Sequence, residues 1–183
     1  MTDYTLEEAD IDLLRSEGMT EDDLEHSILV AEKSLDLARR TGADLDMEFV
    51  GRGGLFHDLG KTVSREIDHG YCGAQRGAEL GLPEEINGMM EKHIRGGVTE
   101  PEAIDFGLPV KDYTLRRLEE KIIAYADRLV DIIHEDLVEL DNELEAETRF
   151  EAILNDIAKY GNNDITRTRY LSYHNEIQKL IAK

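Results

Sequence analysis

Apolar residues recur every three or four positions along almost the whole chain, the spacing that gathers them on one face of an α-helix. The stretch from Glu21 to Arg40 is the clearest case, and Thr20 before it is a good residue to begin a helix. Its apolar stripe consists of Leu24, Ile28, Ala31, Leu35 and Ala38. Alternating runs of β-branched residues between tight turns, which would indicate strands, are hard to find. The sequence therefore predicts an all-α fold.

Start and stop signals divide the chain into roughly six to eight helices. Besides 21–40, the expected helices cover residues 45–59, a short piece within the glycine-rich 62–81, a segment from Leu82-Pro83-Glu84-Glu85 to Gly96-Gly97, residues 115–140, and two segments on either side of Gly161-Asn162-Asn163. Pro101, Gly107 and Pro109 break the pattern between Val98 and Lys111. We expect this stretch to be a surface loop that rims a site.

Length and charge limit the function. The chain has 183 residues, enough for one domain with a proper core, so we expect a single domain over residues 1–183. It carries 21 Lys and Arg against 41 Asp and Glu, a formal net charge of −20. A surface of this charge repels polyanions, so a general nucleic-acid-binding protein is disfavoured. A small anionic substrate could still bind where basic residues gather locally.

Cysteine use and hydropathy favour the cytoplasm. Cys72 is the only cysteine, which excludes an intramolecular disulfide and fits a reducing compartment. The start Met1-Thr2-Asp3-Tyr4 lacks the apolar core of a signal peptide. No run of about 18 apolar residues, the length that a membrane span requires, occurs in the sequence. We therefore predict a cytoplasmic protein without a membrane segment.

Histidines and aspartates in helical contexts suggest a metal site, because imidazole and carboxylate are common ligands of divalent transition metals. His57 and Asp58 are adjacent at the expected end of a helix, where neighbouring side chains can point into one cavity. His26 lies beside an apolar stripe and would face inward. Asp127 follows the apolar run Ile122-Ile123-Ala124-Tyr125-Ala126. A buried carboxylate must be paired or coordinated, and a metal would satisfy that need.

These residues, in this order, resemble the motif of the HD-domain metal-dependent phosphohydrolase superfamily. The resemblance rests on His26, then Leu55-Phe56-His57-Asp58-Leu59-Gly60-Lys61, then Tyr125-Ala126-Asp127. His-Asp-Leu-Gly-Lys is close to the His-Asp-Ile-Gly signature of one branch. The similarity covers residues 22–135 and implies a compact HD-domain helical bundle. Residues 137–183 would then form a helical C-terminal extension that completes the core or forms a homodimer surface.

The resemblance also implies a ligand set. His26, His57, Asp58 and Asp127 match the residues that bind one divalent metal in the superfamily. In its dinuclear branches two further histidines lie between the His-Asp pair and the distal aspartate. His69 and His93 occupy that interval here, and Asp58 would then bridge two ions. The implied cofactor is one or two divalent ions, which could be Mn, Fe, Zn, Ni, Co or Mg. His134 and His174 are expected to be ordinary surface or capped side chains.

The implied chemistry is hydrolysis of a phosphate ester by water, because a divalent metal lowers the pKa of water and neutralises charge on phosphoryl oxygens. Asp58, Lys61 and Asp68 are the candidate catalytic residues, with Asp68 as a proton-transfer partner. The candidates for binding the substrate phosphate are Lys61, Arg65, Arg95 and Arg128, because ammonium and guanidinium groups pair with phosphate oxygens.

The sequence favours a phosphomonoesterase or phosphodiesterase acting on a small phosphorylated substrate, for which we expect a nucleotide. Two alternatives stay open. An HD-type nuclease would cut RNA or DNA, but it would usually have a basic track, and the acidic composition offers none. A non-catalytic sensor would bind a metal or a nucleotide without turnover, and the intact ligand positions disfavour it.

Overall fold

The computed structural model describes residues 4–183, so Met1, Thr2 and Asp3, on which part of the signal-peptide argument rests, lie outside it. Every regular element among the described residues is a helix, which confirms the all-α prediction. Eleven α-helices and two short 3-10 helices are present in this part of the chain, more than the six to eight expected. None of these helices combines the length and apolar content needed to cross a membrane.

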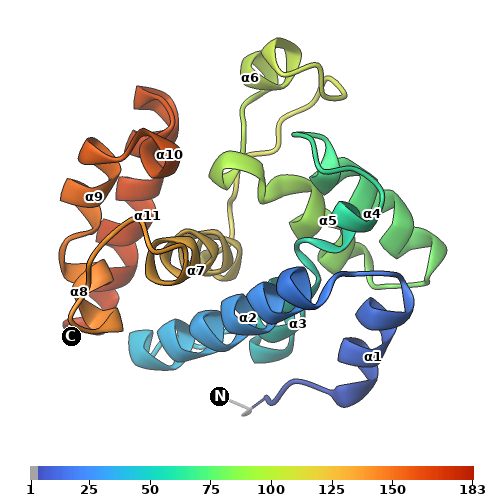
Figure 1. The fold of residues 1–183 in the computed structure, drawn as a ribbon, viewed down its shortest axis with the longest axis horizontal. Coiled ribbons are helices and arrows are strands. Elements are labelled where there is room, and N and C mark those ends of the chain that lie inside the picture. The colour runs from blue at the N-terminus through green and yellow to red at the C-terminus, as the bar shows by residue number, and fades with distance from the viewer. Residues whose placement is uncertain (1–3) are drawn as a thin grey trace.

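Helix α2 (Glu21–Thr41) runs through the middle of the molecule and packs against α3 (Met47–Phe56) and α7 (Leu118–His134) (Figure 1). Its ends follow the sequence signals. The Thr20 side chain accepts a hydrogen bond from the backbone N–H of Asp23, and Gly42 ends the helix with a left-handed φ of 64°. The apolar face of α2 therefore lies against both neighbours, and its first turns lie beside α7.

Three helices lie on the other side of α3 (Figure 1): α1 (Glu8–Ser16), α4 (His69–Glu79) and α5 (Glu84–Lys92). The 3-10 helix η1 (Leu59–Thr62) connects α3 to this group and packs directly on α4. Gly60 makes that approach possible, because a Cβ there would lie 1.8 Å from the carbonyl oxygen of His69. The segment after the His-Asp pair is thus held against the start of α4.

The expected surface loop between Val98 and Lys111 contains a helix, α6 (Glu100–Asp105), so that prediction was wrong. Thr99 and Glu102 form a capping box, and Pro101 fits the first turn because it needs no N–H partner there. The segment buries a small core of its own, consisting of Val98, Ala103, Leu108 and Tyr113. Pro101, which indicated a loop, therefore lies in the first turn of a helix.

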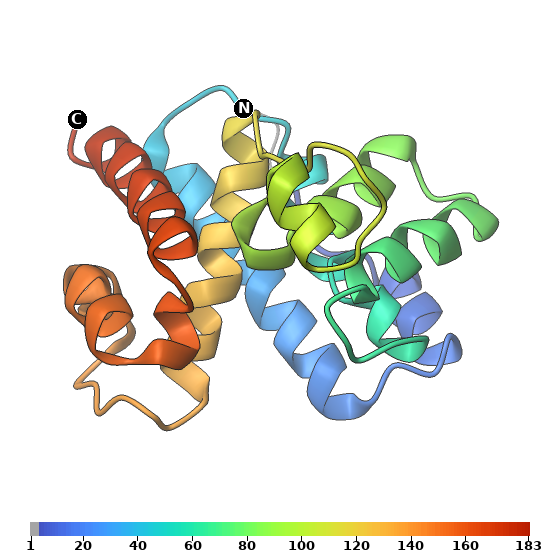
Figure 2. The ribbon, with the colours of Figure 1, turned by 90° about the horizontal axis from the view of Figure 1, so that it is seen from above.

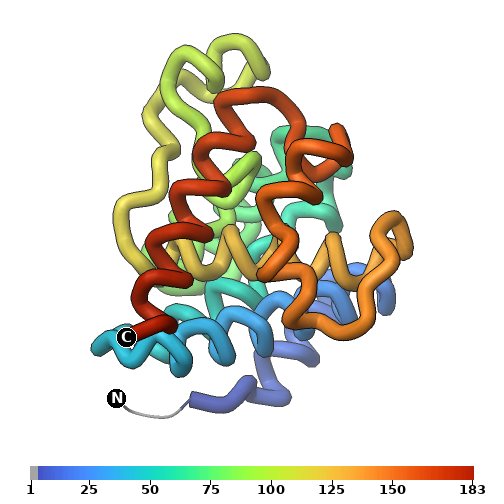
Figure 3. The backbone as a smooth tube through the Cα atoms, turned by 90° about the vertical axis from the view of Figure 1, so that its left-hand side faces the viewer, coloured from blue at the N-terminus to red at the C-terminus, as the bar shows by residue number. Residues whose placement is uncertain are grey.

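The C-terminal part forms four helices rather than the two expected: α8 (Glu143–Thr148), α9 (Phe150–Asp156), α10 (Ala158–Gly161) and α11 (Asp164–Ile181). Helix α7 ends at His134 instead of near residue 140, and Asp136 has a left-handed φ of 55° just beyond it. Figures 1 and 2 show α8 to α11 gathered along one side of α7. In the side view of Figure 3, α11 crosses in front of α7.

Aromatic packing joins α11 to α7. The Tyr125 and Phe150 rings meet edge to face at 4.9 Å, and the Tyr125 hydroxyl is 2.7 Å from Nδ1 of His174. Both ring residues are fully buried in one core cluster that takes side chains from α2, α7, α9 and α11. The C-terminal helices therefore share a core with the helices that carry the motif, and their near ends reach the site.

Candidate metal centre and phosphate pocket

Six histidines and aspartates from different parts of the chain meet in one place. Helix α2 supplies His26, and α7 supplies Asp127. His57 caps the C-terminus of α3, and Asp58, with φ −102° and ψ 10°, has already left the helix. Because the helix ends here, the two adjacent side chains can serve one site. His69 begins α4, and His93 follows the last residue of α5.

The first group of donors surrounds Oδ1 of Asp127. This oxygen lies 3.1 Å from Nε2 of His26 and 3.4 Å from Nε2 of His57. Oδ2 of Asp58 completes the group, 3.3 Å from the same nitrogen of His57 and 3.8 Å from that of His26. Four donor atoms from three segments of the chain therefore converge.

The second group surrounds the other oxygen of Asp58. Its Oδ1 lies 3.3 Å from Nε2 of His69 and 3.5 Å from Nε2 of His93. These two ring nitrogens are 3.1 Å apart. Asp58 thus lies between the two groups and presents one oxygen to each, the position that a bridging carboxylate occupies between two ions.

Backbone carbonyls orient three of the four imidazoles in the same way. Nδ1 of each ring lies 2.6 to 2.7 Å from the carbonyl oxygen three residues earlier; the pairs are His57 with Gly54, His69 with Glu66, and His93 with Met90. Each Nδ1 must donate there, so each ring, once neutral, has its lone pair on Nε2, facing the centre. This arrangement is the usual outer support of metal-binding histidine.

Burial and charge set the protonation of the centre. His57 and Asp58 are 1% and 2% exposed. Burial raises the pKa of Asp58 and of Asp127, but the facing histidines outweigh it and hold both values well below the usual range. Burial lowers the pKa of His57, and the two carboxylates outweigh that and raise it. The carboxylates are therefore ionised, and an entering cation displaces a proton from imidazole.

The donor set fits a divalent metal. Two sets of three donor atoms, His26–His57–Asp127 and His57–Asp58–His93, each lie within 4.8 Å of one another. Nε2 of His57 is buried and has no hydrogen-bond partner among the described residues. The ε nitrogens of His69 and His93 direct lone pairs toward the same space, which is unfavourable without a proton or a cation between them. Mixed imidazole and carboxylate donors suit Zn, Mn, Fe or Ni.

A pocket of about 340 Å³ opens beside the centre. Its wall includes most of the expected site residues, namely His26, Asp58, Lys61, Arg65, His69, His93, Arg95, Asp127 and Arg128. His57 is buried behind this wall. Nζ of Lys61 lies 2.5 Å from Oδ2 of Asp58, and the Arg65 guanidinium pairs with Asp23 at the start of α2. The candidate phosphate-binding cations therefore share one cavity with the candidate ligands.

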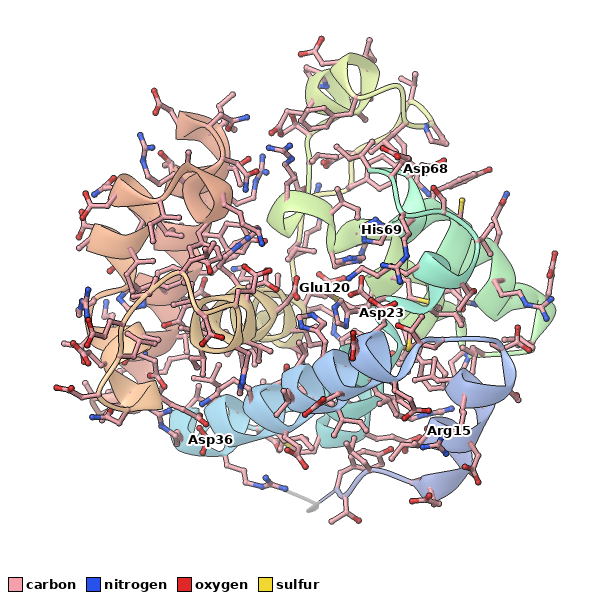
Figure 4. The ribbon with its side chains drawn as sticks, viewed as in Figure 1. Arg15, Asp23, Asp36, Asp68, His69 and Glu120 are labelled. Atoms are coloured by element: carbon pink, nitrogen blue, oxygen red, sulfur yellow. The ribbon has the colours of Figure 1, made fainter. Side chains whose placement is uncertain are left out.

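Asp68 is the expected site residue that lies outside both donor groups and the pocket wall. It precedes α4, and its Oδ1 accepts a hydrogen bond from the Ser64 hydroxyl at 2.5 Å. In Figure 4 it lies beyond His69, on the side away from α2. Its contacts are those of a residue that fixes the loop before α4.

Sequence reasoning missed Asp131, Lys159, Asn162 and Tyr170, which also line the pocket. Asp131 follows Asp127 by one helical turn, and this spacing was the available signal. Its Oδ1 lies 3.9 Å from Nδ1 of His26, on the far side of the ring from the centre. Burial, with repulsion from Asp127, raises the pKa of Asp131 to about 7. Lys159 comes from α10, Asn162 follows the last residue of α10, and Tyr170 comes from α11; no local pattern indicated them.

Comparisons with known proteins identify the family and the fold. The family model described as HD domain matches residues 23–131 of the sequence. An uncharacterized protein of Methanocaldococcus jannaschii is 43% identical over 114 residues, which are 61% of this chain and 68% of that protein. A tRNA (cytidine(56)-2'-O)-methyltransferase of Picrophilus torridus is 42% identical over 85 residues, which are 46% of this chain. The Ribonuclease Y of Pseudothermotoga lettingae is 36% identical over 72 residues, 38% of this chain.

The matched part is only 25% of the methyltransferase and 14% of the ribonuclease. Among solved structures, the HD domain of the L. monocytogenes phosphodiesterase PgpH in complex with cyclic-di-AMP has a TM-score of 0.63 at 16% identity. This alignment covers 95% of this chain and 94% of the PgpH chain, so the fold is shared over nearly the full length. Since the family model covers more than half of the sequence, the chain belongs to the HD-domain family.

Proposed function

We propose that this protein is a metal-dependent phosphohydrolase that cleaves a phosphate ester of a nucleotide with water. One observation carries the proposal: the two oxygens of Asp58 face two separate groups of imidazole nitrogens, at 3.3 to 3.8 Å. Such an arrangement fits two ions that share one carboxylate. HD-domain family membership supports the same reaction class.

In this proposal six residues hold the metal: His26, His57, Asp58 and Asp127 at the first position, and His69 and His93 with Asp58 at the second. A divalent ion supplies a lowered water pKa and neutralises charge on the phosphoryl group. The protein supplies the rest. Nδ1 contacts to carbonyl oxygens keep the rings of His57, His69 and His93 aimed at the centre before substrate arrives.

Lys61 is the proposed cation nearest the reacting phosphate. Burial lowers its pKa, but Asp58 outweighs that effect, so the pKa of Lys61 is raised and its ammonium is charged. Arg65, Arg95 and Arg128 are the further phosphate-binding candidates. Asp58 would hold the metal through both of its oxygens, and the Lys61 ammonium would meet a phosphoryl oxygen. Asp68 is the weakest of the candidate catalytic residues, proposed as a proton-transfer partner. Its hydrogen bond from the Ser64 hydroxyl does not favour this role.

A nucleotide suits the pocket because five cations, including Lys159, gather there in a chain of net charge −20. The PgpH domain that shares the fold was solved with cyclic-di-AMP, which supports a nucleotide substrate. The related methyltransferase and Ribonuclease Y are named for work on RNA, and this chain matches only a small part of each. An RNA substrate therefore stays the second candidate, and a sensor that binds without turnover is the third.

The test begins with metal analysis of the purified protein, followed by a phosphate-release screen over nucleoside mono- and triphosphates, dinucleotides, cyclic nucleotides and labelled oligonucleotides with Mn²⁺. We expect nucleotide hydrolysis that Asp58→Asn reduces by at least 100-fold. His134→Gln, which changes a histidine outside both donor groups, is the matched control. Cleavage of oligonucleotides alone would favour the nuclease. Metal binding without hydrolysis of any substrate would favour the sensor.

A further inference from the structure

The pocket extends well beyond the metal centre. On one side its wall comes from α4 and the 3-10 helix η2 (Ile94–Gly96), and on the other from α10 and α11. These two sets of elements face each other across α7 in Figure 1. Lys159 and Asn162 belong to the C-terminal helices, outside residues 23–131 that match the family. The C-terminal extension therefore contributes one side of the pocket.

Two cations in the outer part of the pocket, Arg95 and Arg128, lack strong acidic partners, whereas the third, Lys159, pairs with Glu135 at 2.7 Å. Among the contacts of the described residues, the Arg95 guanidinium stacks on the Phe106 ring at 5.2 Å and pairs with no carboxylate. Arg128 makes only long contacts, 3.4 Å each to Asp131 and to the Tyr170 hydroxyl, and its Nε is buried without a partner. Lys61 and Arg65, in contrast, pair closely with aspartates. Arg95 and Arg128 thus keep donor groups for a bound anion.

Two residues of this outer part have a costly backbone conformation. Three non-glycine residues in the described part of the chain have positive φ, and Arg95 (51°) and Asn162 (57°) are two of them. Asn162 combines that φ with ψ −95°, outside the left-handed helical region. Strain of this kind persists where the surrounding fold imposes it, and it gathers at binding sites. Both residues line the same cavity.

The fold also fixes the Arg95 turn from the C-terminal side. Arg169 of α11 donates to the Arg95 carbonyl oxygen at 3.0 Å, and the Tyr173 hydroxyl donates to that of Gly96 at 2.8 Å. Tyr170, which lies between Arg169 and Tyr173 in the sequence, lines the pocket. Its ring centroid lies 4.9 Å from the Arg128 guanidinium. Helix α11 therefore holds Arg95 and Arg128 in place while α10 brings Lys159 across from them.

We propose that Arg95, Arg128, Lys159 and Asn162 form a second anion subsite, which binds a phosphate of the substrate other than the one being cleaved. This inference rests on the proposed function and names its substrate class: nucleotides that carry two phosphate groups on separate oxygens. Guanidinium and ammonium groups bind such a phosphate through charge-assisted hydrogen bonds, and the Asn162 amide adds a neutral donor. The scissile phosphate occupies the metal centre beside Lys61.

Matched substrate pairs test the subsite. The diester pair is the dinucleotide ApA with and without a 5′-terminal phosphate, and the monoester pair is adenosine 5′-monophosphate with and without a 3′-phosphate. In the pair that the metal-loaded enzyme cleaves, we expect the additional phosphate to raise kcat/KM by about 10-fold or more, since a hydrogen bond to a charged group contributes that much. A ratio close to one in the wild-type protein would overturn the proposal.

Variants then locate the effect. Lys159→Gln and Asn162→Gly should each lower that ratio at least about 3-fold, and glycine keeps the positive φ of residue 162 without strain. Lys121→Gln is the control: Lys121 pairs with Glu176 at 2.8 Å, much as Lys159 pairs with Glu135 at 2.7 Å, but it lies outside the pocket wall. A merely structural role would lower kcat/KM for both members of the pair equally and would contradict the subsite.

If neither pair is hydrolysed, the wider phosphate-release screen decides the proposed function, and the subsite is judged by binding alone. Equilibrium dialysis of the metal-loaded protein then compares adenosine 3′,5′-bisphosphate with adenosine 5′-monophosphate. Tighter binding of the bisphosphate, lost in Lys159→Gln and kept in Lys121→Gln, supports the subsite. Equal binding of the two nucleotides, or an equal loss in both variants, overturns it.

Discussion

The ε nitrogens of His69 and His93 lie 3.1 Å apart, and each ring has its Nδ1 against a backbone carbonyl oxygen. Both Nδ1 atoms donate, so two lone pairs face one another beside Oδ1 of Asp58. Such a pair is stable when a cation or a proton shares the space. An ion held by these two rings and Asp58 would be the second ion of a dinuclear centre. Without it, the centre would be mononuclear.

We predict that His93→Ala lowers the bound metal from two equivalents to one and leaves the ion held by His26, His57 and Asp127. The reason is that only the second donor group loses a nitrogen. Elemental analysis after dialysis against a metal-buffered solution measures the stoichiometry. His134→Ala, outside both groups, should keep two equivalents. A wild-type stoichiometry of one ion, unchanged in His93→Ala, would reject the dinuclear centre.

Asp131→Asn should weaken metal binding about 10-fold with little change in fold, because partners behind a ligating imidazole typically contribute 10- to 100-fold in affinity. Oδ1 of Asp131 lies 3.9 Å from Nδ1 of His26, which no backbone carbonyl among the described residues holds. Competition with a chromophoric chelator measures the dissociation constant. Asp105→Asn, an exposed aspartate of α6, is the control. An unchanged constant in Asp131→Asn would show that His26 needs no orienting carboxylate.

The sequence was informative where a residue's role depends on its immediate neighbours. His57 and Asp58 lie at a helix end marked by Gly60, and Asp127 interrupts an apolar run, so each could be recognised locally. Lys159 and Tyr170 could not, because their place in the pocket depends on how the C-terminal helices pack across α7. That packing depends on buried aromatic side chains far apart in the sequence. The spacing of apolar residues within one helix does not predict it.

Helix α6 was missed for a different reason. Pro101, with Gly107 and Pro109, indicates a break in the helical pattern, although proline is also favoured in the first turn of a helix. The deciding signal was the pair Thr99 and Glu102, three residues apart, which forms the capping box. A search for that pair on either side of each proline predicts the helix. The site residues on either side of it were unaffected.

Gly60→Ala should reduce both stability and metal content. The added Cβ would lie 1.8 Å from the His69 carbonyl oxygen and 2.5 Å from the backbone nitrogen of Gly73, so η1 and α4 must separate and carry His69 away from Asp58. We expect a loss of about 1–3 kcal/mol in the free energy of unfolding, measured in urea. Gly88→Ala in α5 is the matched control, because its Cβ meets nothing within 4 Å. That variant should gain about 0.5–1 kcal/mol. Equal stability of the two variants would contradict this account.

Glu147 should make the attachment of α8 to α2 depend on pH. Its carboxylate accepts hydrogen bonds from two nitrogens of Arg40, at 2.7 and 2.9 Å, and from Gln178 at 2.7 Å. Burial raises the pKa of Glu147, and these donors outweigh it, so the folded-state pKa lies below the usual value of 4.5. The stabilisation is therefore complete above pH 4.5 and is lost as the pH falls through the lower, folded-state value.

Glu147→Gln should accordingly cost about 1–3 kcal/mol of unfolding free energy at pH 7, and the difference from wild type should shrink below pH 4.5. Urea titrations at a series of pH values measure it. Glu143→Gln removes a carboxylate that pairs with Lys33 of α2 at 2.6 Å but is 59% exposed, so it should cost less than about 1 kcal/mol. A Glu147→Gln penalty that stays constant down to pH 3 would show that the ionised carboxylate is not the stabilising species, because protonation of Glu147 would then leave the contact with Arg40 intact.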